Sequence, residues 1–188
     1  MTNLRSVLHL SMSNLKELTW EHHKNAERQD FVKELMGGIS AERYCDFLHN
    51  QHPQYNILEN FARLHNLTDI IIAPKIHADI LELERQLTDY KPTIYPVVEK
   101  YSNHLLKIKD DPNKLMAHIY VRHMGDLSGG QMIAKRIPGA GTMYQFDEEV
   151  DILKDKIRTK LDDSMADEAK ICFDFATELF QQMAVSNN

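Results

Sequence analysis

Apolar side chains recur three and four residues apart along almost the whole chain, while runs that alternate apolar and polar residues are scarce. A spacing of three and four places side chains on one face of an α-helix. We therefore predict an all-α fold, with helices near residues 11–35, 40–66, 75–89, 93–107, 112–136, 147–162 and 165–184. No repeat or long linker interrupts the pattern, so we expect residues 1–188 to form a single domain with its core in residues 11–184.

Charge and cysteine usage exclude several classes of protein. The formal net charge of −6 argues against binding to nucleic acid or to an acidic membrane surface. No apolar run approaches the roughly 18 residues that a membrane span needs. Cys45 and Cys172 belong to no C-x-x-C pattern, which argues against a cysteine-based metal motif. Residues 1–10 lack a convincing signal peptide and the two thiols suit a reducing compartment, so we expect a soluble, cytoplasmic protein without a membrane partner.

The most informative segment is 120–131, which lies within the helical pattern and contains three glycines in six positions. A glycine inside a helix costs about 1 kcal/mol relative to alanine, so three of them require a physical reason. Gly125 and Gly129 are four residues apart on one face, where missing side chains leave room for a flat ligand or for a closely packed helix. The third glycine allows a bend. Asp126 and Ser128 favour the ligand, because a carboxylate beside such a face can hold ordered water.

The run Gly125-Asp126-Leu127-Ser128-Gly129-Gly130-Gln131 resembles the signature of the heme oxygenase family, and Tyr120 and Arg122 extend the match upstream. Flanking segments match in the same order, so the resemblance covers roughly residues 14–183. It implies a multi-helix fold in which heme is sandwiched between a proximal helix and a kinked distal helix. On the distal side it implies that the glycines leave room for O₂ and that the aspartate anchors a water network. The catalytic residues it implies are Asp126, Gly125, Gly129, Arg122 and Tyr55.

The proximal helix of the resemblance lies near the N-terminus. The family's iron ligand is a histidine in an H-x-x-A-E setting, which here falls on His23. His22 is the rival, because the two side chains point about 100° apart on a helix and cannot both face one iron. Lys16 is seven residues before His23 and is placed for a heme propionate, and Glu27, one turn later, is placed to orient the ligand imidazole.

Other heme contacts follow from the same resemblance. Lys154 and Arg158 form an i, i+4 pair that resembles the family's propionate-binding cations, although a solvated helix face explains such a pair equally well. The full set of predicted heme contacts is Lys16, His23, Glu27, Tyr120, Ser128, Gly130, Lys154, Arg158 and Phe173. Tyr55 fits either the distal water network or a half-buried core position. Two residues depart from mammalian members: His123 stands where they carry tyrosine, and Ala176 where they carry asparagine.

The resemblance also implies the reaction. Heme b serves as both cofactor and substrate, and O₂ and external electrons convert it to biliverdin, with the IXα isomer expected, together with ferrous iron and CO. No flavin or nicotinamide motif is present, so the electron donor must be a separate protein. Residues 151–160 carry four cations against two acids, a basic surface that favours an acidic ferredoxin. A bilin reductase is a possible downstream partner.

Four alternatives remain open from the sequence. A non-catalytic heme-binding or storage protein of the same fold would share the heme contacts, but it would have no need of Asp126. A thiaminase-type enzyme needs a nucleophilic cysteine, and neither cysteine lies in a supporting motif. A di-iron carboxylate oxidase needs Glu-x-x-His pairs that face inward from two helices, and no convincing pair is found. A purely structural bundle would not need the glycine cluster.

Overall fold

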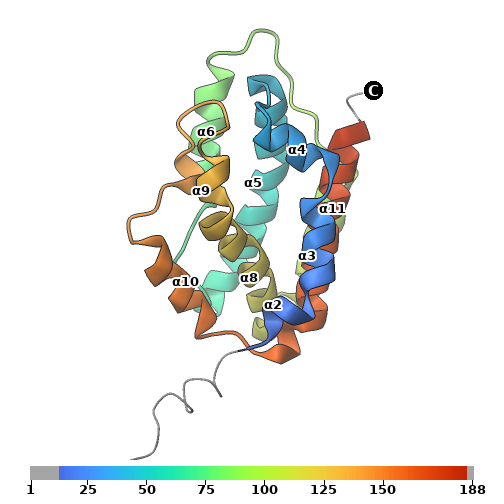
Figure 1. Ribbon diagram of the computed structural model, residues 1–188, viewed down its shortest axis with the longest axis vertical. Helices are drawn as coiled ribbons and strands as arrows, with labels where there is room; N and C mark the ends of the chain where they lie inside the picture. The colour runs from blue at the N-terminus through green and yellow to red at the C-terminus, as the bar shows by residue number, and fades with distance from the viewer. Residues whose placement is uncertain (1–12, 186–188) are drawn as a thin grey trace, which may run out of the picture.

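The computed structural model describes residues 13–185, and no strand occurs in that part of the chain. The all-α prediction is therefore confirmed, and Figure 1 shows the arrangement of the helices. The α-helices are α2 (Leu15–Leu18), α3 (Trp20–Glu27), α4 (Asp30–Met36), α5 (Ala41–Leu64), α6 (Ala73–Glu84), α7 (Pro96–Ile108), α8 (Pro112–Ser128), α9 (Gly130–Ile133), α10 (Val150–Arg158) and α11 (Ala166–Val185). Two short 3₁₀ turns, η1 (Thr142–Tyr144) and η2 (Asp163–Met165), precede α10 and α11.

The predicted helix 11–35 is three helices in the structure. Residues 11 and 12 lie outside the described part of the chain. The first break falls at Thr19, whose hydroxyl donates a 2.8 Å hydrogen bond to the carbonyl of Leu15 and so competes with the helical backbone pattern. The second falls at Gln29, whose extended backbone starts a new helix at Asp30. The amphipathic spacing continues across both breaks, which is why the sequence alone did not reveal them.

The long central helices agree better with their predictions. Ser40 caps α5 by accepting a 3.2 Å hydrogen bond from the backbone of Arg43, and Asp111 caps α8 by accepting one of 3.1 Å from Lys114. A proline inside a helix removes a backbone hydrogen-bond donor and predicts a kink or a break. α5 nevertheless continues through Pro53 without a break. The predicted helix 112–136 is interrupted at Gly129, which ends α8 and precedes α9, so the helix is broken within the glycine-rich segment.

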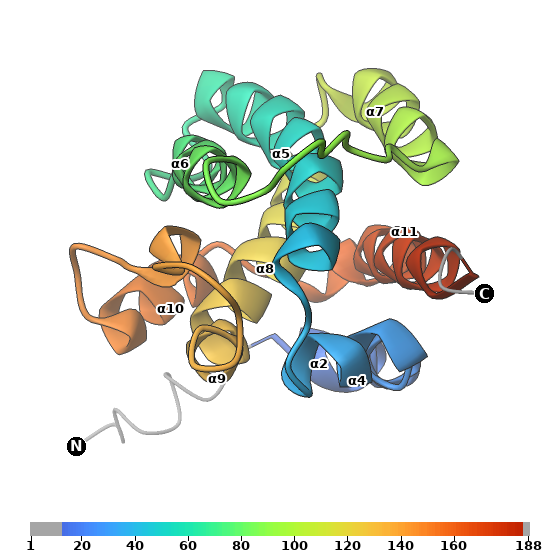
Figure 2. The same cartoon turned by 90° about the horizontal axis from the view of Figure 1, so that it is seen from above.

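α8 crosses the middle of the molecule, with the other helices arranged around it (Figure 2). It packs against α5, α7, α10 and α11. Nearly every residue of α8 from Leu115 to His123 is buried. α3 lies along α11, which also packs against α8 (Figure 1). The long helix α11 therefore supports both the predicted proximal helix, α3, and the predicted distal helix, α8.

Candidate functional site

The glycine-rich end of α8 presents a backbone face that no side chain covers. A methyl group added at Gly125 would meet nothing within 4 Å, and one added at Gly129 would meet only the carbonyl oxygen of Gly125, at 3.7 Å. Gly130 behaves differently: a methyl group there would lie 2.5 Å from the ring of Tyr144. Close packing therefore explains Gly130 without a ligand, whereas the other two glycines border open space, and Ser128 is exposed between them.

Asp126 lies beside this open face and is held by a buried tyrosine. The Tyr55 hydroxyl donates a hydrogen bond of 2.6 Å to Oδ2 of Asp126. Burial raises the pKa of Asp126 to about 7, even though the hydrogen bond from Tyr55 and the nearby His123 and Arg122 lower it. A carboxyl group with such a pKa can hold or release a proton near neutral pH. The structure thus joins Tyr55 to Asp126, the first of the two positions that the sequence left open for this tyrosine.

Arg122 is the centre of a buried polar network behind Asp126. Its Nε donates a 3.0 Å hydrogen bond to the hydroxyl of Tyr101 on α7, and one terminal nitrogen donates a 2.6 Å bond to Oε1 of Gln54 on α5. The guanidinium also lies over the rings of Tyr101 and Tyr55, at 4.3 and 5.4 Å from their centroids. Arg122 therefore fixes the ring of Tyr55, which in turn holds Asp126.

His123, the departure noted in the sequence, is fully buried next to Asp126. Its Nε2 is 2.9 Å from Oε2 of Glu59, a carboxylate that also accepts hydrogen bonds from the backbone of Ile72 and Ala73 at the start of α6. Its Nδ1 has no hydrogen-bond partner, the one such buried side-chain atom found in the described residues. A buried nitrogen without a partner is costly, so the hydrogen bonding of His123 is satisfied only on its Nε2 side.

On the opposite side, α3 carries the predicted iron ligand. The His23 imidazole stacks on Phe173 of α11, with ring centroids 4.9 Å apart and an interplanar angle of 14°. Its Nε2 is 2.7 Å from Oε1 of Glu27, one turn later on the same helix, as the sequence predicts for an orienting carboxylate. Nδ1 is thus the nitrogen left for an iron ligand, unless the ring turns about its Cβ–Cγ bond. The side chain is 31% exposed and accessible to a ligand.

The remaining predicted contacts lie in two groups. His22, the rival ligand, has its Nδ1 2.7 Å from a carboxylate oxygen of Asp174 on α11. Lys16 is exposed on α2, and Tyr120 on α8 is buried. On α10, Arg158 forms a 2.8 Å ion pair with Asp155, whereas Lys154 forms no ion pair with any residue in the described range 13–185. α10 packs against α8, whereas α2 packs against α3 and α3 packs against α11.

The imidazole of His23 and the uncovered backbone at Gly125 and Gly129 fit the requirements of a heme group. A partly exposed imidazole on α3, backed by the flat ring of Phe173, is the type of ligand that holds heme iron. A helix face without side chains at Gly125 and Gly129 leaves room for a planar group and a small diatomic molecule. Had Gly125 been packed against a neighbouring helix, the same sequence motif would have had a purely structural explanation.

Sequence analysis missed most of the buried polar network. Five buried polar residues were not predicted. One of them lies on α8 and the others form hydrogen bonds to residues of α8: His118, Tyr101, Gln54, Glu59 and Glu168. A signal was available: His118 and Arg122 are an i, i+4 pair on a helix whose neighbouring positions are apolar. Polar residues at helical spacing on an apolar face must find partners from other helices.

Comparisons with known proteins agree with this geometry. A family model described as "Heme oxygenase" matches residues 10–182. A heme oxygenase of Guillardia theta is 30% identical over 203 residues, covering 92% of this chain and 85% of its own length. One of Porphyra purpurea is 30% identical over 205 residues, covering 92% and 86%.

Solved structures give the same result for the fold. Heme oxygenase from Leptospira interrogans superposes with a TM-score of 0.77 at 26% identity, covering 89% of this chain and 97% of that one. Heme oxygenase-1 of Synechocystis sp. PCC6803, solved in complex with heme, shares the fold with a TM-score of 0.73 at 23% identity, covering 90% of each chain. Fold and site define an all-helical protein with an uncovered backbone face at the glycine-rich end of α8. The chain belongs to the heme oxygenase family and is an enzyme of the heme oxygenase type.

Among residues 13–185, no helix is both long enough and apolar enough to cross a bilayer.

Proposed function

We propose that this protein binds one heme b between α3 and α8 and cleaves it, with O₂ and external electrons, to biliverdin, ferrous iron and CO. The observation that carries the proposal is the uncovered backbone at Gly125 and Gly129, directly beside a carboxyl group that titrates near pH 7. When bound, the heme supplies both the iron that activates O₂ and the ring that is opened. The protein supplies the ligand, the space and the proton-holding group.

On the proximal side, the chain's residues bind and orient. His23 provides the imidazole for the iron, and Glu27 holds the ring in place by a hydrogen bond within the same helix. Phe173 supports the ring from α11. A neutral imidazole is a weaker electron donor than a thiolate and favours cleavage of the O–O bond less strongly, which suits a reaction directed at the porphyrin.

On the distal side, the residues manage space and protons. Gly125 and Gly129 leave room for O₂ to lie along the helix, and Ser128 is exposed on the same stretch. Asp126 keeps water ordered and passes protons to it, while Tyr55, held by Arg122, fixes the direction of the carboxylate.

The propionates are assigned to the cationic and phenolic groups near the edges of the site: Lys16, Tyr120, Lys154 and Arg158. Each exposed ion pair contributes only about 0–1 kcal/mol, so these groups set the orientation of the ring more than its affinity. Orientation decides which meso carbon faces the distal helix, and we propose cleavage to the IXα isomer. Gly130 is part of this site only through the backbone, because its Cα faces Tyr144.

For the electron donor we propose an acidic ferredoxin that docks near α10. Lys154 and Arg158 are assigned to the propionates, so the cations of this segment left for docking are Lys156 and Lys160. Lys156 is paired with Glu148, and Lys160 donates a hydrogen bond to the carbonyl oxygen of Leu67. The docking surface is therefore less positive than the residue count of this segment predicts, and we expect a moderate dependence of turnover on salt. A bilin reductase is the class of enzyme that would take up the released product.

The test is aerobic turnover of the protein loaded with one equivalent of heme, supplied with ferredoxin, ferredoxin reductase and NADPH. We expect loss of the Soret band, growth of a bilin spectrum and release of CO. A heme complex that stays unchanged under these conditions, and also with ascorbate as reductant, would contradict the proposal and would favour a heme-storage protein of the same fold.

A further inference from the structure

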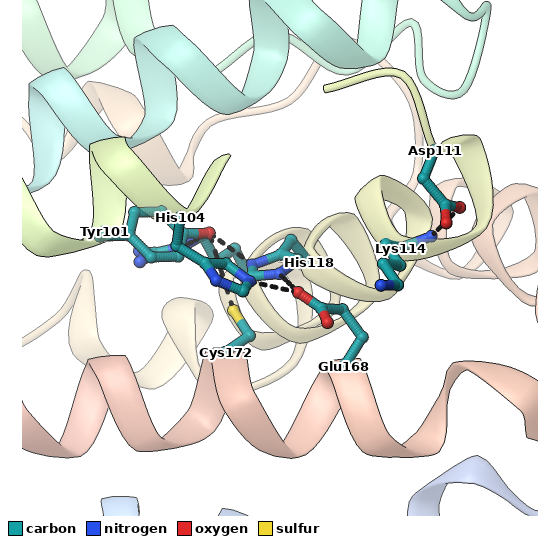
Figure 3. Close-up of polar contacts among 8 residues, drawn as sticks. Tyr101, His104, Asp111, Lys114, His118, Glu168 and Cys172 are labelled. Atoms are coloured by element: carbon teal, nitrogen blue, oxygen red, sulfur yellow. Dashed lines mark hydrogen bonds and ion pairs between the residues drawn. The ribbon is translucent and has the colours of Figure 1, made fainter. Parts of the chain in front are cut away.

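A second group of ligand-type side chains lies away from the proposed heme face, where α7, α8 and α11 meet. His104 from α7, His118 from α8 and Glu168 from α11 converge on one point, with Tyr101 and Cys172 behind them (Figure 3). Nε2 of His104 is 2.5 Å, and Nε2 of His118 2.8 Å, from the same oxygen of Glu168, Oε1. The three ligand atoms all lie within 4.8 Å of one another.

We propose that His104, His118 and Glu168 form a binding site for a first-row divalent transition-metal ion, separate from the heme. Two imidazoles and one carboxylate are a ligand set suited to ferrous iron, cobalt or zinc, and three protein ligands leave positions open for water. Neighbouring ligands of an ion bound at about 2.1 Å are roughly 3.0 Å apart in octahedral and about 3.4 Å apart in tetrahedral geometry. The observed separations from the carboxylate oxygen, 2.5 and 2.8 Å, are shorter, so the side chains would have to rotate apart to admit an ion.

The surroundings of His118 orient it for this role. Its Nδ1 is 2.7 Å from the hydroxyl oxygen of Tyr101, so the ring presents Nε2 to Glu168. With an ion on Nε2, the proton of the His118 ring is on Nδ1, and this N–H donates a hydrogen bond to the hydroxyl oxygen of Tyr101. A hydrogen bond of this kind is the usual way in which an outer partner orients a metal-bound histidine. That oxygen also accepts a hydrogen bond from Nε of Arg122, and its own proton can turn toward Sγ of Cys172, 3.9 Å away.

The cluster has an approach from solvent. The His118 side chain is fully buried, the Glu168 side chain is 8% exposed and the His104 side chain is 21% exposed. An ion would therefore enter past His104, the ligand at the edge of the cluster.

The chain contains a natural comparison in a second three-residue group, Cys45, His49 and Glu84, between α5 and α6. Here burial raises the pKa of the Cys45 thiol to about 11. Because the thiolate is the form that binds metals, this group must lose a tightly held proton before it can act as a full ligand set. A substitution of His49 thus provides a matched control, in which one imidazole is removed from a similar but less favourable cluster.

The experiment is a titration of the full-length chain without heme, using Co²⁺ alone, followed by its visible absorption, and using Zn²⁺ alone, followed by calorimetry. We expect one ion per chain. His104→Ala should weaken binding by more than about tenfold, since it removes a direct ligand, and Glu168→Gln should do the same. His49→Ala should leave the affinity and the Co²⁺ spectrum unchanged. His104 is preferred to His118 for the test because it is partly exposed, so its removal endangers folding least.

Three results would overturn the proposal: no binding of either ion at millimolar concentration, unchanged affinity in His104→Ala, or loss of binding in His49→Ala instead. A purely structural role of the cluster would show as a lower melting temperature in His104→Ala with no stabilisation of the parent chain by Zn²⁺. Because the titration uses no heme and no reductant, its outcome is independent of whether heme is cleaved.

Discussion

The two helices assigned to the heme differ in how far they are organised without it. On α8, Asp126 is held by Tyr55, which Arg122 fixes through contacts with α5 and α7. On α3, His23 is partly exposed and its hydrogen bond reaches only Glu27, one turn away on the same short helix. The distal side is thus braced by buried groups from several helices, whereas the proximal side depends on packing against α11.

This contrast is expected to appear first in turnover. Asp126→Ala removes the proton-holding group but leaves the space and the iron ligand, so heme should still bind while bilin formation falls by about 10²–10⁴-fold. The measurement is heme affinity and turnover on the same preparation. Asp147→Asn, an exposed aspartate in the loop before α10, is the control and should behave like the parent chain. Full turnover by Asp126→Ala would break the assignment of protons to the distal side.

The proximal side is expected to control affinity instead. His23→Ala should weaken heme binding by more than about tenfold and abolish the histidine-type Soret spectrum, because the iron–imidazole bond is lost. Exogenous imidazole should restore the spectrum in part. His22→Ala removes a side chain that already bonds Asp174 and should keep the spectrum. If the two variants exchanged these results, the ligand would be His22.

The raised pKa of Asp126 predicts a pH effect on stability in the protein without heme. The folded state keeps this carboxyl protonated up to about pH 7, whereas the unfolded chain releases the proton near its ordinary value of 3.8. The associated stability is fully present below pH 3.8 and is lost as pH rises through about 7. Between pH 5 and 7 the parent chain should therefore lose roughly 2 kcal/mol more than Asp126→Asn. Urea unfolding at both pH values measures this; equal losses would contradict it.

The glycine-rich segment offers a matched pair of substitutions, at Gly125 in α8 and Gly130 in α9. Gly125→Ala enters open space and removes a helix-interior glycine, so it should stabilise the protein without heme by about 0.5–1 kcal/mol while slowing turnover. Gly130→Ala meets the ring of Tyr144 and should destabilise by about 1–3 kcal/mol. Thermal unfolding distinguishes them. A destabilised Gly125→Ala would indicate that this face is packed after all.

The smallest effect is expected at the rim. Arg158 is exposed and already paired with Asp155, so Arg158→Ala should change the free energy of heme binding by less than about 1 kcal/mol. A change in the ratio of biliverdin isomers is the more sensitive measurement, because the side chain is assigned to orientation. Unchanged affinity together with an unchanged isomer ratio would remove Arg158 from the site.

Sequence patterns predicted the fold class and the position of the ligand face, because helical spacing and the cost of clustered glycines are local properties. They missed the breaks at Thr19 and Gln29, where amphipathic spacing continues across a change in backbone direction. They also missed the link from Arg122 to Tyr101, since which polar residues meet across helices depends on tertiary packing that no single-helix pattern contains.

The central claim is that α3 supplies an imidazole and α8 an uncovered backbone face to one heme. Its most direct test is a titration of the purified chain with ferric heme, followed by the Soret band, in the parent chain and in Gly125→Leu. The account predicts a complex of one heme per chain with a histidine-type spectrum in the parent, and strongly weakened binding in a variant that remains folded. A parent chain that binds no heme, or a Gly125→Leu variant that binds it equally well, would contradict the account.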